Sequence, residues 1–136
     1  MTQKLKVLIV EDEMILASDI RMQLQNEGYN VVGIAKNGEK AINLTKERNP
    51  DIILMDIAIK GEIDGVETAE EIHKFYDVPI VYITAYFDDK TLNRAIKTEP
   101  YGYIIKPFQD GQIHCTIVLA IYKYQQEQAL KDFYKQ

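Results

Sequence analysis

The chain has 136 residues and a formal net charge of -5, a length typical of one domain. It has no cluster of lysines and arginines, which argues against direct nucleic-acid binding, and no apolar run of about 18 residues that would predict a membrane span. Its one cysteine, Cys115, excludes an internal disulfide framework and fits a reducing compartment. We therefore expect a soluble protein or fragment that works in the cytoplasm.

Short apolar runs alternate with helical patterns along the whole chain. Strands are predicted at residues 5–10, 29–35, 52–55, 79–84 and 102–105. Helices are predicted from Leu16, Ile20 and Leu24 to Gly28, from the Asn37-Gly38 turn to about Arg48, at 66–76, at 88–97, and from about 110 towards the end. Five strand-helix repeats imply an α/β fold, in which a parallel sheet is doubly wound with helices on both faces.

The third predicted strand is apolar throughout and is followed directly by Asp56. A continuous apolar run predicts a strand buried on both faces, in the middle of the sheet. Asp56 would then lie at the carboxyl edge, where open α/β sheets bind their ligands. This position makes Asp56 a candidate nucleophile for a phosphoryl group.

Other strands also end in polar groups: Glu11 and Asp12 after the first, Thr84 at the end of the fourth, and Lys106 after the fifth. The carboxyl ends of parallel strands share one edge, so these side chains should converge on Asp56. Three neighbouring carboxylates repel unless a cation neutralises them, and Mg²⁺ prefers such oxygen ligands. A lysine adds positive charge, and a threonine hydroxyl can donate to a phosphoryl oxygen.

Each of these residues also has an ordinary structural interpretation. Glu11 and Asp12 could begin the first helix, where acids favour the dipole, and Asp56 could be a turn residue. Thr84 could be a strand residue, and Lys106 a solvated surface charge. The functional interpretation depends on their occurring together at successive strand ends.

The stretches VLIVEDE, IILMD, DG, VYITA and GYIIKPF resemble the receiver domain of two-component response regulators over about residues 5–122. The resemblance implies a five-stranded parallel sheet with five flanking helices in the flavodoxin-like order 2-1-3-4-5. It also implies a signalling domain rather than an enzyme proper, and a cis peptide bond at Lys106-Pro107.

The family's roles transfer by position. Asp56 would accept phosphate from a histidine of a sensor kinase or phosphotransfer domain. Glu11, Asp12, Asp56 and the carbonyl of Ala58 would bind Mg²⁺. The phosphoryl group would be contacted by Thr84 and Lys106, and Tyr103 would be the aromatic residue that turns inward with Thr84.

Two positions depart from the commonest family pattern. Ala58 has no polar side chain to orient water, and Tyr86 is bulky. Both flank the path of an attacking water in this family. We therefore expect a phosphoaspartate that hydrolyses slowly.

The last helix is apolar around most of its circumference, which favours deep burial or cover by a partner. The resemblance makes the surface of helix 4, strand 5 and helix 5 the switching face and a candidate homodimer interface; a wide core stripe with stray exposed residues explains the pattern equally well. We expect a receiver at 1–124 and, at 125–136, an extension of the last helix that links to an output domain. A frayed terminal tail is the alternative.

Three rival functions fit the sequence less well. An aspartyl-phosphate hydrolase would carry a second acid at the position of Ala58. A nucleotide-binding loop at residues 33–40 would need a lysine where Glu39 stands. A pseudo-receiver that only scaffolds would lack the aspartate or the lysine. His73 and His114 are interpreted as structural.

Overall fold

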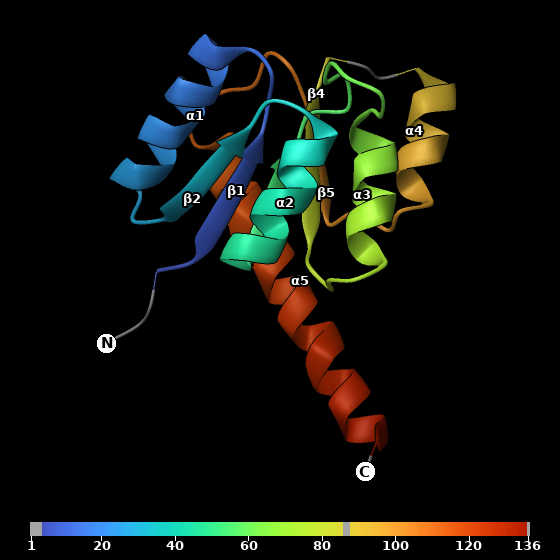
Figure 1. Ribbon diagram of the computed structural model, residues 1–136. Helices are drawn as coiled ribbons and strands as arrows, with labels where there is room; N and C mark the ends of the chain where they lie inside the picture. Colours follow the sequence, from blue (N-terminus) through green and yellow to red (C-terminus); the bar gives the residue numbers. More distant parts are fainter. Residues whose placement is uncertain (1–3, 86–87, 136) are drawn as a thin grey trace.

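The computed structural model describes residues 4–85 and 88–135 and contains the predicted alternation of strands and helices (Figure 1). The strands are β1 (Lys6–Val10), β2 (Asn30–Ala35), β3 (Ile52–Met55), β4 (Ile80–Thr84) and β5 (Gly102–Ile105). The helices are α1 (Met14–Asn26), α2 (Gly38–Arg48), α3 (Gly65–His73), α4 (Asp89–Ile96) and α5 (Gln112–Lys135). The predicted fold class is thereby confirmed.

The five strands form one parallel sheet in the order β2-β1-β3-β4-β5. The central position of β3 follows from its sequence, because all four of its residues are buried and need cover on both faces. In the register, Val10 pairs with Met55 and Thr84 with Ile105. These pairs bring the carboxyl ends of the strands to one level, as the sequence predicts.

Two helical layers cover the sheet. On one face, Ala17, Ile20 and Leu24 of α1 pack with Ile113 and Ile117 of α5. The other face is covered by α2, α3 and α4, which lie together in front of the sheet in Figure 1. Burial of these apolar side chains is the main stabilising contribution to the fold.

Several local boundaries differ from the sequence prediction. The Asn37-Gly38 pair begins α2 instead of forming a separate turn: Asn37 is the N-cap, and its side chain accepts from the backbone N–H of Lys40. Helix α3 ends at His73, before Tyr76, because the chain must turn into β4. Tyr29 precedes β2, although its side chain is buried.

Helix α5 is the longest element, with 24 residues, and its distal half runs past the edge of the sheet to the C-terminus (Figure 1). The inward stripe Ile113, Ile117 and Ala120 is buried. Further along, Leu130, Phe133 and Tyr134 are exposed. No helix in the described ranges combines the length and the hydrophobicity needed to cross a bilayer.

Candidate functional site

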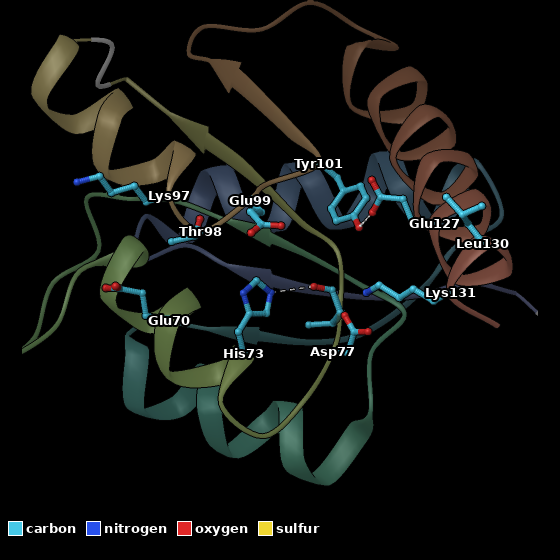
Figure 2. Close-up of a pocket in the computed structure, with 11 residues that line it drawn as sticks. Glu70, His73, Asp77, Lys97, Thr98, Glu99, Tyr101, Glu127, Leu130 and Lys131 are labelled. Atoms are coloured by element: carbon cyan, nitrogen blue, oxygen red, sulfur yellow. Dashed lines mark hydrogen bonds between the residues drawn. The ribbon is translucent and has the colours of Figure 1, made fainter. Parts of the chain in front are cut away.

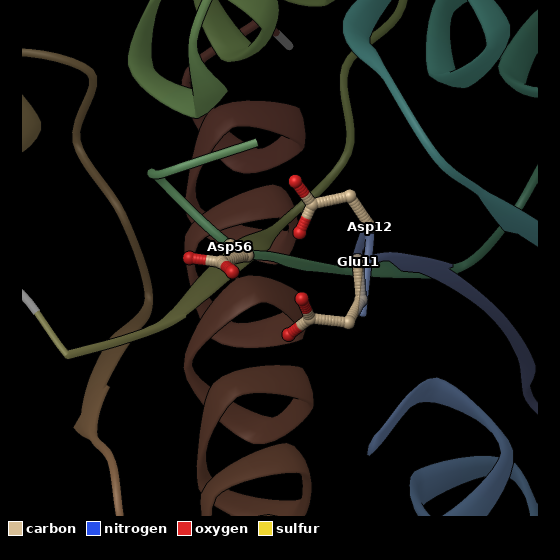
Figure 3. Close-up of side chains that lie close together, drawn as sticks. All are labelled: Glu11, Asp12 and Asp56. Atoms are coloured by element: carbon tan, nitrogen blue, oxygen red, sulfur yellow. The ribbon is translucent and has the colours of Figure 1, made fainter. Parts of the chain in front are cut away.

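Three carboxylates meet at the carboxyl edge of the sheet. Glu11 and Asp12 follow β1, and Asp56 follows β3, so that their side chains point toward one another (Figure 3). One oxygen of each lies within 4.8 Å of the others. Glu11 and Asp56 are buried, whereas Asp12 is half-buried. The convergence predicted from the strand ends is present for these residues.

Lys106 joins this cluster from the end of β5. Its Nζ lies 2.7 Å from Oε1 of Glu11 and 3.0 Å from Oδ2 of Asp56. The lysine side chain is only 19% exposed, so the two ion pairs are shielded from solvent and are stronger than surface pairs. Lys106 is therefore the internal counter-ion of Glu11 and Asp56, not a solvated surface charge.

The charges in the cluster shift one another's protonation. Burial raises the pKa of Glu11 to about 7, helped by the nearby charge of Asp56 and opposed by the hydrogen bond from Lys106. Burial alone would lower the pKa of Lys106, but hydrogen bonds from its ammonium to Glu11 and Asp56 raise it. Lys106 therefore stays charged at neutral pH. The pKa of Glu11 would fall if positive charge were added nearby.

Backbone hydrogen bonds hold the carboxylates in place. The N–H of Asp56 donates to the carbonyl of Val10 (3.0 Å), and Oδ1 of Asp56 accepts from the N–H of Ala58 (3.0 Å). Oδ2 of Asp12 accepts from the N–H of Lys60 (3.1 Å). The loop that follows Asp56 is thus attached to Asp12. Sequence reasoning missed this contact, since a backbone donor carries no residue-type signal.

Gly65, the first residue of α3, packs against the backbone of Asp56 and Ile57. A Cβ at this position would lie 2.3 Å from the carbonyl oxygen of Asp56, a distance that no side chain tolerates without displacing backbone. The N–H of Gly65 donates to the carbonyl of Ile57 (2.8 Å). The helix predicted at 66–76 begins one residue earlier, at Gly65, with Asp64 as its N-cap; the sequence pattern does not indicate the close approach of Gly65 to the Asp56 backbone.

The remaining predicted site residues lie on β4 and β5. Thr84 is fully buried, and its carbonyl accepts from the backbone N–H of Lys106 (2.9 Å). Tyr103 is half-buried, and its ring lies edge-on to that of Tyr82 with centroids 6.1 Å apart. The Lys106-Pro107 peptide bond is cis, as the resemblance implies.

Positions outside the cluster behave largely as expected. His114 contacts the hydroxyl of Tyr29 (2.8 Å) and the carboxylate of Glu27 (3.0 Å), and His73 contacts the carbonyl of Val78, so both histidines have structural partners away from the site. Cys115 is exposed. Tyr86 lies outside the described residues.

The donor set suits a hard divalent cation. Three carboxylates supply oxygen ligands at one edge, and such oxygens, with water, are what Mg²⁺ takes in proteins. Lys106 contacts one oxygen each of Glu11 and Asp56. Their second oxygens each accept one backbone N–H and keep a further lone pair for a metal ion, and Asp12 is half-buried. The acidic cluster is therefore compatible with Mg²⁺ and with phosphorylation.

Comparison with known proteins identifies the family. A family model described as the response regulator receiver domain matches residues 7–118. The chain belongs to this family. It is accordingly a receiver domain of two-component signalling systems, with the sheet order and helix number found above.

The similar proteins are regulators and receiver domains. The chain is 33% identical to the transcriptional regulatory protein PdtaR of Mycobacterium tuberculosis over 126 residues, which are 93% of this chain and 61% of that protein. It is 33% identical to the transcriptional regulatory protein YdfI of Bacillus subtilis over 117 residues, 85% of this chain and 54% of that protein. The receiver thus spans only about half to three fifths of these relatives.

A solved structure gives a close match in three dimensions. The signal receiver domain of a modulated diguanylate cyclase from Desulfovibrio desulfuricans is 40% identical, with a TM-score of 0.86. The alignment covers 92% of this chain and 99% of that one. The likeness therefore extends over most of this chain and nearly all of that receiver domain.

Proposed function

We propose that the receiver accepts a phosphoryl group on Asp56 from the phosphohistidine of a sensor kinase or phosphotransfer domain. The observation that carries this proposal is the contact of the Lys106 ammonium with Asp56 inside the acidic cluster. In the transfer, the N–P bond of the phosphohistidine breaks and an O–P bond to Asp56 forms. The histidine nitrogen keeps the electron pair, and Lys106 offsets the negative charge that arrives.

The same cluster would hold Mg²⁺. Glu11, Asp12 and Asp56 are the carboxylate candidates, and the carbonyl of Ala58 is the further oxygen donor that the family pattern indicates. When bound, the ion supplies positive charge that neutralises phosphoryl oxygens during in-line transfer. Asp12 is the most accessible of the three carboxylates, which favours it as a direct ligand.

Thr84 and Tyr103 are proposed as the switch. Thr84 stands at the end of β4, next to the strand that leads to Lys106, so its hydroxyl can be drawn toward a new phosphoryl group. Tyr103 is only half-buried, and its ring would turn inward when Thr84 moves. Phosphorylation would then act as a charge switch on the surface formed by α4, β5 and α5.

The decisive experiment is intact mass after incubation with acetyl phosphate and Mg²⁺. The wild type should gain one phosphoryl group, and Asp56→Asn should gain none. Asp19→Asn, which changes an exposed acid on α1, is the matched control and should behave as the wild type. If the wild type gains nothing from acetyl phosphate or from a phosphorylated kinase, the proposal is wrong.

The phosphoaspartate should be long-lived, because Ala58, two residues after Asp56, offers no polar side chain to orient an attacking water. The mass gain should persist for minutes or longer after acetyl phosphate is removed. Ala58→Asn supplies an amide at this position and should shorten the lifetime. A wild-type half-life of seconds contradicts the proposal.

We further propose the organisation of the longer protein. The receiver extends over residues 1–124, and residues 125–136 link it to an output domain in the same chain, in the cytoplasm; α5 runs through this link as far as Lys135. The relatives named as transcriptional regulatory proteins favour an output in gene regulation.

Exposed Ile96 and Ile105 on α4 and β5 favour a homodimer through the α4-β5-α5 surface. Sedimentation of the phosphorylated chain as a monomer at every concentration would contradict this homodimer.

A further inference from the structure

The distal half of α5 is attached to the receiver body by hydrogen bonds at the edge of the sheet opposite Asp56. The hydroxyl of Tyr124 donates to the carbonyl of Asp77 (3.3 Å), and Nε2 of Gln128 donates to Oδ2 of Asp77 (3.1 Å). The hydroxyl of Tyr101 donates to the carboxylate of Glu127. We call these five residues the α5 clamp.

Ring contacts strengthen the same junction. The rings of Tyr101 and Tyr124 meet edge-on, with centroids 5.8 Å apart, and Nζ of Lys123 lies 5.7 Å from the centre of the Tyr101 ring. Figure 2 shows Tyr101 and Glu127 turned toward one another at the rim of a groove of about 700 Å³ between α5 and the ends of α3 and α4. At this point α5 is therefore attached both to Tyr101 and to Asp77.

The two anchor points stand at the starts of β4 and β5. Asp77 lies three residues before β4, and Tyr101 directly precedes β5. The N–H of Tyr101 donates to the carbonyl of Ile80 (2.8 Å), which joins the two starts. At their other ends, the same two strands carry Thr84 and Lys106.

We propose that the α5 clamp attaches α5 to the receiver body as far as Gln128, four residues past the expected domain boundary at 124, and that it passes a displacement of β4 and β5 to the end of the helix. Paired strands such as these are stiff, so a displacement at Thr84 or Lys106 reaches Asp77 and Tyr101. Leu130 and Phe133 lie beyond the clamp on the same helix. Their positions therefore depend on the direction in which the clamp holds α5. The second half of this proposal rests on the proposed phosphorylation of Asp56; the first half does not.

The first test compares amide hydrogen exchange of residues 124–130 in two triple variants. Tyr101→Phe/Tyr124→Phe/Gln128→Ala removes the donors of the clamp. Tyr122→Phe/Gln126→Ala/Tyr134→Phe changes the same residue types at exposed positions of α5. Alanine is a better helix former than glutamine, so faster exchange in the clamp variant cannot come from helix propensity.

The clamp variant should exchange at least tenfold faster over 124–130, because it loses the three hydrogen bonds that oppose local opening of the helix. The control should match the wild type. Equal exchange in all three proteins would overturn the assignment of residues 124–128 to the receiver body.

The second test repeats the measurement after acetyl phosphate and Mg²⁺, with intact mass recorded on the same samples. In phosphorylated wild type, exchange over 124–130 should change about threefold or more, and this change should be absent in the equally phosphorylated clamp variant. A phosphorylated wild type without the change overturns the coupling. A wild type that gains no phosphoryl group overturns the proposed function and the coupling with it, while the first test still decides whether the clamp exists.

Discussion

The two edges of the sheet are held together by different kinds of interaction. At the carboxyl edge, Lys106 forms ion pairs with the buried acids Glu11 and Asp56. At the amino edge, Tyr101, Tyr124 and Gln128 make hydrogen bonds in partly solvated surroundings. Buried charges respond strongly to added charge, whereas such hydrogen bonds mainly fix geometry. The contrast separates the part of the receiver suited to chemistry from the part suited to holding a helix.

Removing the internal counter-ion should have the largest effect. Lys106→Met leaves Glu11 and Asp56 buried without their partner, and breaking a buried pair in this way costs about 3 kcal/mol. Urea unfolding without Mg²⁺ should show this loss, and Mg²⁺ should restore part of it by replacing the missing positive charge.

The control for that change is Lys74→Met, which breaks the exposed pair between Lys74 and Glu71. It should leave the unfolding midpoint unchanged, because exposed pairs contribute little. If the two variants lost equal stability, the carboxyl edge would not be electrostatically distinct from the surface.

Gly65→Ala should come next, with a loss of about 2 kcal/mol from overpacking. The new methyl group would meet the carbonyl oxygen of Asp56 at 2.3 Å, and backbone cannot yield as a side chain can. Gly33→Ala is the control: its Cβ would meet the flexible side chain of Leu44 at 3.1 Å. In thermal unfolding, the Tm of Gly65→Ala should lie well below that of Gly33→Ala. A reversed order would refute the close approach of Gly65 to the Asp56 carbonyl.

Tyr82→Phe probes the core between the two edges and should cost about 1 kcal/mol at pH 7. The Tyr82 hydroxyl shares a 2.7 Å hydrogen bond with Thr98, and burial raises the pKa of Tyr82 from 10.0 to about 12. Above pH 10 the unfolded chain loses this proton first, so wild-type stability falls as pH rises from 10 to 12.

Phenylalanine has no proton to lose, so the free energy of unfolding of the Tyr82→Phe variant does not fall in this way above pH 10. The stability gap between the two proteins should close near about pH 11. Urea unfolding at pH 7, 9, 10 and 11 measures it. A gap that stays constant would show that the Tyr82 hydroxyl is not shielded from solvent.

The smallest effect is expected beyond the clamp. Leu130 is 57% exposed, so Leu130→Ala should change the unfolding free energy by less than about 0.5 kcal/mol. Ile117→Ala, on the buried stripe of the same helix, should cost about 3 kcal/mol. Urea unfolding of both variants at micromolar concentration makes the comparison. Equal losses would place the end of α5 inside the folded core.

Much of the carboxyl edge could be predicted from sequence, because strand ends in a parallel sheet share one edge whatever their separation along the chain. Asp12, Asp56 and Lys106 were found in this way. The sequence could not predict that Lys106 pairs with Glu11 and Asp56 and not with Asp12. This pairing depends on the reach of the side chains and on their burial in the folded site.

The amino edge was largely invisible to the same reasoning. Tyr101 and Glu127 are 26 residues apart, and Asp77 and Gln128 are 51 apart; tyrosine and glutamine occur on many exposed helices, so neither pattern indicates a contact. The boundary predicted at 124 rests on the apolar stripe, and polar contacts further along the helix, such as those of Glu127 and Gln128, carry no comparable sequence signal. The helix boundaries near Tyr76 and Gly38 differ from the predicted ones, because helix ends depend on local backbone geometry that the apolar pattern does not show.

An unbroken α5 also has a consequence for any protein fused behind it. Each residue of an α-helix advances the chain by about 1.5 Å and turns it by about 100°. Deleting or inserting a single residue between Gln128 and Lys135 would therefore swing a joined domain by more than a quarter turn without altering the receiver. The number of residues after the clamp is in this sense an angular setting, and linkers of equal composition but different length are not interchangeable.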